Sequence, residues 1–134
     1  MGKEVTMDKE VAMDKEQCIQ QFWSSFEIPA YDERTVPASA SMPYITYELS
    51  TDTFGRFLQL SASLWYHSTG WAAITRKANE IGALIGAGGI LRPYNGGALW
   101  IVRGSPFTQR MDDPNDSSIR RIVLQIYVEF MSEN

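Results

Sequence analysis

Cysteine and histidine are almost absent from these 134 residues, since each occurs only once, as Cys18 and His67. A single cysteine forms no disulfide within one chain, and a zinc site of the Cys/His type needs more ligands than these two. The two residues are formally a thiol–imidazole nucleophile pair. However, Cys18 adjoins the apolar face of a predicted helix, which favours a buried and inert thiol, and His67 follows a predicted strand, which favours a surface position.

Long apolar runs and clustered positive charge are also missing. The longest apolar stretch, residues 81–91, is glycine-rich and too short to span a bilayer. The formal net charge of −4 and the pI near 4.9 oppose nucleic-acid binding, which needs clustered lysine and arginine. Residues 1–16 contain charged side chains throughout and no apolar segment of the signal-peptide kind. We therefore expect a cytoplasmic protein with neither a membrane nor a sequence-specific nucleic-acid partner.

No complete catalytic, cofactor or metal motif is present. Gly82, Gly86, Gly88 and Gly89 lack the Gly-Lys-Ser/Thr ending of a phosphate loop, and they lie at the end of a predicted helix instead of its start. Close helix packing is the simpler interpretation of these glycines. The acidic run at residues 112–116 lacks the spacing of a calcium loop. The sequence therefore predicts no enzyme, no cofactor and no metal, which leaves protein–protein interaction as the default function.

The length and composition are those of one ordinary globular domain, with 44% hydrophobic residues. A short repeat precedes that domain, because residues 5–10 recur with one substitution as residues 11–16. Two copies are too few for a repeat architecture. We predict a flexible N-terminal extension over residues 1–13 and a single α+β domain over residues 14–134.

Hydrophobic periodicity predicts two helices and four main strands. The first helix begins at Asp14, which has the spacing of a capping box with Gln17, and the second covers residues 70–87. Residues 104–118 are typical of a long polar loop, with an extension of the third strand over 107–111 as the alternative. Alternation of apolar and polar residues predicts strands at residues 43–49, 57–66, 98–103 and 119–130.

The predicted element order is therefore α-β-β-α-β-β. Consecutive strands joined by short loops favour antiparallel pairing, and an antiparallel sheet is commonly covered on one face only. We expect an α+β fold with an antiparallel sheet of about four main strands and two helices on one face.

Four features of the sequence occur together in one family. The first helix leads into a Pro-Ala-Tyr turn at residues 29–31, and a Met-Pro-Tyr-Ile-Thr-Tyr strand opening follows at residues 42–47. A single helix follows the predicted hairpin. A glycine turn, a strand, a long polar loop and an alternating strand ending at residues 126–130 complete the order. Over residues 14–131 this succession resembles the small tail-terminator proteins of long-tailed bacteriophages and the related tail-completion and head–tail joining proteins.

The resemblance implies a structural virion protein. Terminators form a hexameric ring that caps the tail tube, stops its growth and offers a docking surface to the head connector. The implied partners are further copies of the chain, the tail-tube protein and the head connector, and the implied location is a virion tail assembled in the host bacterial cytoplasm. Our interface candidates are aromatic side chains of the sheet and residues of the two polar loops: Tyr44, Thr51, Asp52, Phe54, Arg56, Trp65, Trp100, Phe107, Arg110, Asp112, Asp113 and Tyr127.

Other functions stay open at this point. A head–tail joiner or a tail-tube subunit of the same particle shares the pattern. A different class is a small-ligand-binding or enzymatic α+β domain with a pocket between helix and sheet, although the sequence lacks a set of convergent titratable groups. A regulatory module that binds a host protein is a further alternative.

Overall fold

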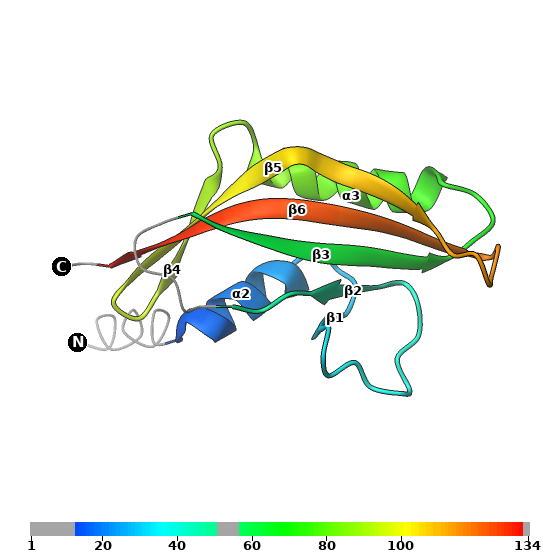
Figure 1. Cartoon of the computed structure of the whole chain (residues 1–134). Helices are drawn as coiled ribbons and strands as arrows, with labels where there is room; N and C mark the ends of the chain where they lie inside the picture. The colour runs from blue at the N-terminus through cyan, green and yellow to red at the C-terminus, as the bar shows by residue number, and fades with distance from the viewer. Residues whose placement is uncertain (1–12, 51–56, 133–134) are drawn as a thin grey trace.

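The structure, a computed structural model, describes residues 13–50 and 57–132. Over these residues the chain forms helices α2 (Lys15–Ser24) and α3 (Ala72–Ile85) and six strands. The strands form a single mixed sheet, in the order β1-β2-β3-β6-β5-β4, that curls into a half-barrel (Figure 1). The strand bounds are β1 Ala30–Asp32, β2 Tyr44–Tyr47, β3 Leu58–His67, β4 Ile90–Tyr94, β5 Gly97–Asp112 and β6 Ile119–Ser132.

The predicted fold, an antiparallel sheet of about four strands in the order α-β-β-α-β-β, is therefore wrong. β1 pairs with β2 in parallel and makes the sheet mixed, and β4 pairs antiparallel with β5 at the other edge. β1 has only three residues, which is too short for an alternation to be recognised. β4 contains Pro93 and runs into the turn residues Asn95 and Gly96, so its composition is typical of a loop.

Residues 104–112 are not a loop, because β5 continues from the third predicted strand to Asp112. The alternative, in which that strand extends over residues 107–111, is the one the structure confirms. A register shift between Arg103 and Thr108 accommodates the stretch that contains Gly104 and Pro106. Such a bulge lets a strand resume its pairing after residues that do not fit the ladder. Antiparallel pairing with β6 resumes at Thr108, opposite Leu124, and only residues 113–118 form the connection.

The predicted capping box at the start of α2 is confirmed. The Asp14 side chain accepts a hydrogen bond from the backbone N–H of Gln17 at 2.8 Å, and the Gln17 side chain accepts one from the backbone N–H of Asp14 at 2.9 Å. These two bonds satisfy N–H groups that a helix start leaves free, which fixes where α2 begins.

One hydrophobic core joins both helices to the sheet. α2 contacts β1 and β4, whereas α3 contacts β3, β5 and β6. The buried residues of both helices join the buried alternate residues of β3, β5 and β6 in one cluster. The largest fully buried side chains are Trp23, Phe22, Ile19, Ile45, Leu60, Leu64, Ile74, Ile81, Ile85, Leu99, Ile101 and Leu124.

The helical glycines serve packing and termination. A Cβ atom on Gly82 would lie 3.0 Å from Cε2 of Phe107, so this glycine lets α3 approach the bulged part of β5. Gly86 ends α3 with φ of 73°, a conformation that favours glycine. Neither α2 nor α3, the helices of the described part of the chain, is long and apolar enough to cross a lipid bilayer.

Candidate interaction surface

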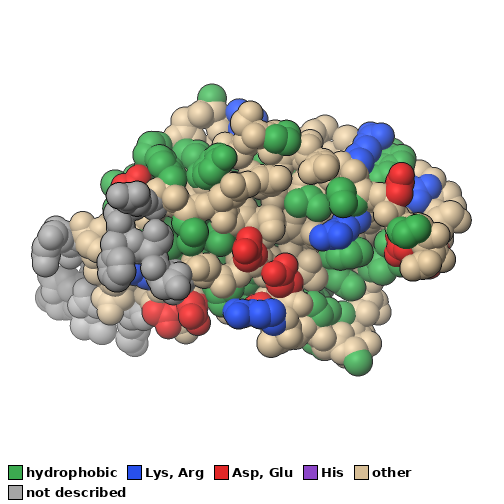
Figure 2. All heavy atoms as spheres, in the orientation of Figure 1, with side chains coloured by type: hydrophobic (Ala, Val, Ile, Leu, Met, Phe, Trp, Pro, Cys, Tyr) green, Lys and Arg blue, Asp and Glu red, His purple; other side chains and the backbone are tan. Residues whose placement is uncertain are grey.

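The sheet face opposite the helices carries the four aromatic residues Tyr44, Trp65, Trp100 and Tyr127 of the predicted interface. Side chains alternate along each strand, so the residues between the buried core positions of β3, β5 and β6 point away from the helices. We call this the outer face. Hydrophobic side chains gather on it over the β4–β5 side and again toward the β5–β6 turn (Figure 2).

The first aromatic group, the Trp100 patch, lies where β4, β5, β6 and the start of β3 meet. Phe57 packs between Trp100 and Tyr127, with ring centroids 5.3 and 6.4 Å away. Phe57, Val102 and Tyr127 line a shallow apolar hollow of about 220 Å³. The indole N–H of Trp100 donates to the Gly88 carbonyl at 3.2 Å, so its polar atom is satisfied while its ring faces solvent.

Exposed aliphatic side chains enlarge the Trp100 patch. Leu91 lies opposite Trp100 in the β4–β5 ladder, and Met131 lies opposite Ala98 on the same face. Phe57, Leu91 and Met131 are 49%, 55% and 41% exposed, and only Leu84 and Met111 are further exposed large hydrophobics among the described residues. Three of the five exposed large hydrophobic side chains of the described residues therefore lie in one patch. Exposed apolar patches commonly mark interaction sites.

The second aromatic group, the Trp65 patch, lies toward the other end of the outer face. Tyr44 lies opposite Trp65 across β2 and β3 and packs edge-on against Tyr31, with centroids 5.8 Å apart. The Arg121 guanidinium lies 4.7 Å from the Trp65 ring centroid. Its Nε–H also donates to the Ser63 hydroxyl at 3.1 Å. A planar cation held over an indole is well placed to meet a carboxylate or an aromatic ring of a partner.

The turn after β5 adds charge to the Trp65 patch. Asp112, Asp113 and Pro114 line a hollow of about 160 Å³ together with Trp65 and Arg121. The predicted interface residues Tyr44, Trp65, Asp112 and Asp113 thus come from three separate parts of the sequence to one place. Their role as contact residues stays a prediction.

The other predicted interface residues fall elsewhere. Phe107 packs on Gly82, and Arg110 lies over the Trp71 ring at 4.7 Å, so both contact α3 and lie off the outer face. Thr51, Asp52, Phe54 and Arg56 lie outside the described residues. Three exposed residues of the outer face, Phe57, Leu91 and Met131, were not among the predicted interface residues. Phe57 shares the period of Gln59 and Trp65, which was a usable signal, whereas Leu91 and Met131 become visible only once β4 is known.

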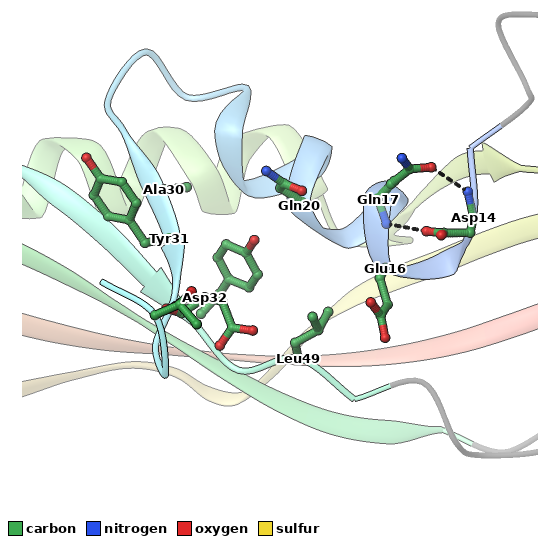
Figure 3. Close-up of a pocket in the computed structure, with 10 residues that line it drawn as sticks. Asp14, Glu16, Gln17, Gln20, Ala30, Tyr31, Asp32 and Leu49 are labelled. Carbon is green, nitrogen blue, oxygen red and sulfur yellow. Dashed lines mark hydrogen bonds between the residues drawn. The ribbon is translucent and has the colours of Figure 1, made fainter. Parts of the chain in front are cut away.

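A polar hollow of about 300 Å³ lies between α2 and the β1–β2 edge (Figure 3). This is the position expected for a ligand pocket if the chain were a small-ligand-binding domain, the alternative left open by the sequence. Asp14 and Gln17 are used in the capping box, and Asp32 forms an ion pair with Arg34 at 3.3 Å. A backbone hydrogen bond from Arg34 is the main cause that lowers the pKa of the Asp32 carboxyl. Three polar side chains of the hollow, Asp14, Gln17 and Asp32, therefore already bond to neighbouring residues of the chain.

His67, Ser118 and Asp116 lie together at the exposed end of β3, but not as a nucleophile triad. The Ser118 hydroxyl lies 3.1 Å from Nε2 of His67 and donates to the Asp116 carboxylate at 2.6 Å. In a triad the carboxylate orients the histidine, and the histidine accepts the serine proton. Here the carboxylate of Asp116 accepts the hydrogen bond of the serine hydroxyl, so that hydroxyl is not directed at His67 as donor. This bond is also the main cause that lowers the pKa of Asp116.

Cys18 is buried in the core, as the sequence indicates. Its sulfur lies 3.7 Å from the carbonyl oxygens of Arg92 and Pro93, which places α2 over the β4 edge. Burial raises the pKa of the Cys18 thiol to about 11. A thiol that stays protonated is a poor nucleophile and a poor metal ligand. Within residues 13–50 and 57–132, no three histidine, cysteine, aspartate or glutamate side chains are grouped as a metal site.

Comparison with known proteins finds a similar fold but no similar sequence. No protein-family model matches the chain, and no curated protein sequence matches it. A chain from a solved structure described as "Virion of native gene transfer agent (GTA) particle" superposes with a TM-score of 0.58. The alignment covers 88% of this chain and 95% of that chain, at 16% sequence identity. The two chains share a fold. An identity this low shows the fold alone.

Proposed function

We propose that this chain is a structural protein of a phage-like virion. The observation that carries the proposal is the fold shared with a virion chain over nearly the whole length of both. The sequence resemblance to phage tail-terminator proteins over residues 14–131 supports the same class from a separate direction. A structural role also suits the outer face, because its two aromatic patches are of the kind that contacts other proteins.

Within that class we propose the role of tail terminator. In this role several copies form a ring, which the resemblance implies to be hexameric, on the end of the tail tube. The ring stops tube growth and presents a surface to the head connector. Its partners are then its own copies, the tail-tube protein and the connector, and its location is the virion tail, assembled in the bacterial cytoplasm. The role needs no cofactor and no catalysis.

The outer face supplies the physical means. Aromatic side chains lose little conformational entropy on binding and bury large areas, so they commonly dominate interface energetics. The Trp100 patch presents Phe57, Trp100 and Tyr127 with their rings already packed on one another. A surface organised before binding loses less freedom when the partner arrives. We propose that this patch contacts another virion subunit.

Electron microscopy of lysates from a producer strain that lacks this gene tests the function. A terminator predicts overlong tails without heads, because nothing stops tube growth. Tails of normal length beside filled, unattached heads would assign the chain to head–tail joining instead. Filled heads with no tail tube would assign it to the tube. Intact particles with unchanged infectivity or gene transfer would contradict a structural role altogether.

A further inference from the structure

Charge is distributed unevenly between the two margins of the sheet. Residues 13–49, which form α2, β1 and β2, contain six carboxylates and two basic side chains. Helix α3 and residues 103–112 of β5 together contain four basic side chains and two carboxylates. β1 is one end of the strand order, and residues 103–112 of β5, which β4 does not reach, form a free edge beyond β6. One margin of the sheet, with α2, is therefore acidic, and the β5 edge with α3 is basic.

The basic margin is built on a free strand edge. β4 pairs with β5 only from Gly97 to Ile101, and no described strand pairs with the outer side of residues 103–112. Residues 108–112 are all exposed and lie in regular pairing with β6. Arg76, Arg103 and Arg110 are the exposed basic side chains of this margin, on α3 and β5. An uncovered edge of this length is normally covered by a partner or blocked against one.

Arg110 is already held in place within the margin. Its guanidinium lies 4.7 Å from the Trp71 ring centroid, and it donates to the Thr75 hydroxyl at 3.5 Å. These contacts tie β5 to the start of α3, next to Arg76. The margin is therefore a continuous surface of strand and helix, and Arg76 and Arg103 can be changed without touching the contacts of Arg110.

The acidic margin lies around the hollow between α2 and β1. Asp14, Glu16 and Asp32 line that hollow, and Glu33 follows β1 directly (Figure 3). Arg34 neutralises part of this charge through its ion pair with Asp32. Glu16 and Glu33 are exposed. The hollow offers a concave, negatively charged surface about 300 Å³ in volume.

We infer that copies of this chain associate head to tail, with the β5 edge of one copy docked along the acidic margin of the next. The inference rests on the proposed function, since a ring needs such a contact, and it names the surfaces that make it. The two margins are different surfaces, because the acidic one adjoins α2 and the basic one adjoins α3. Contacts between unlike surfaces are heterologous, and they generate rings when the rotation closes. The opposite charges of the two margins favour docking of a basic margin on an acidic one. They disfavour contact between two acidic or two basic margins.

Sedimentation velocity of the purified full-length chain tests the inference. The wild-type chain should self-associate at low salt and less so at high salt, because ions screen exposed charges. Two charge-reversal variants are informative: R76E/R103E on the basic margin and E16K/E33K on the acidic margin. Each alone should associate at least about tenfold more weakly than the wild type, because like charges then face each other. An equimolar mixture of the two should recover association, since one unaltered basic margin meets one unaltered acidic margin.

Glu129→Lys on the outer face is the matched control for a charge reversal and should associate like the wild type. The inference is overturned if the wild type stays monomeric at every concentration at low salt. It is equally overturned if either reversal variant associates normally, or if the mixture recovers nothing. None of these outcomes alters the effect of deleting the gene on particles, so a failed docking surface and a failed virion role are distinguished.

Discussion

Replacing Trp23 by alanine should lower the free energy of unfolding by about 3–5 kcal/mol, the usual cost of removing a large aromatic side chain from a core. Trp23 is 0% exposed, and it packs on Phe22 with ring centroids 4.8 Å apart and on Phe26 at 6.5 Å. α2 is only ten residues long, so its stability comes from this packing and little from helix propensity. Chemical denaturation followed by circular dichroism measures the change.

Trp23→Phe separates packing from hydrogen bonding at the same site. The indole nitrogen of Trp23 is buried with no hydrogen-bond partner in the described structure, and an unpaired buried donor is unfavourable. Phenylalanine removes that donor and keeps most of the ring, so it should be clearly less destabilising than alanine. Trp100→Ala is the matched control, because Trp100 is only partly buried. Equal losses at Trp23 and Trp100 would contradict the assignment of the core.

Gly104→Ala should destabilise the protein by about 1–3 kcal/mol, because it forces a new atom into a filled space. A Cβ atom at Gly104 would lie 2.7 Å from the backbone carbonyl oxygen of Gln125 on β6. Two paired strands surround the site, so neither backbone moves without disturbing the ladder. The residue also opens the bulge that brings Phe107 onto α3.

Thermal unfolding of the matched variant Gly70→Ala controls for the loss of glycine flexibility. A Cβ atom on Gly70 meets nothing within 4 Å, so this change should be neutral or slightly stabilising. Gly104→Ala should in addition expose Phe107, which proteolysis near residues 103–112 would detect. A Gly104→Ala protein as stable as Gly70→Ala would show that the bulge does not have the described geometry.

Helices and strands were predicted from the sequence wherever a capping motif or a hydrophobic periodicity lay within one element. The Asp14–Gln17 spacing located the start of α2, and the alternation of residues 119–130 located β6. Both signals come from chemistry within one element. The strand order β1-β2-β3-β6-β5-β4 depends instead on contacts between distant segments, such as Leu58 with Val128. Nothing local specifies that β6 inserts between β3 and β5.

Part of the candidate surface was predicted from the alternation of residues within single strands. Alternation placed Trp65 and Tyr127 away from the core side of their strands, and both lie on the outer face. Arg110 could not be placed, because the register shift in β5 turns it toward α3. Phe107 was assigned to a polar loop, although it lies in β5 and packs on Gly82. Leu91 was missed together with β4, whose proline and turn residues hide its pairing.

The central claim is that this chain is built into a virion through its outer face, and the most direct test is its abundance in purified particles. Quantitative mass spectrometry should find the wild-type chain in particles at a fixed ratio to the other virion proteins. Trp100→Ala/Tyr127→Ala should fold but be lost from particles, since interface aromatics contribute about 2 kcal/mol or more each. Gln59→Ala/Gln125→Ala, which removes a hydrogen-bonded polar pair beside the Trp100 patch on the same face, should be retained. Particles that lack the wild-type chain, or contain the aromatic variant at the normal ratio, would contradict the account.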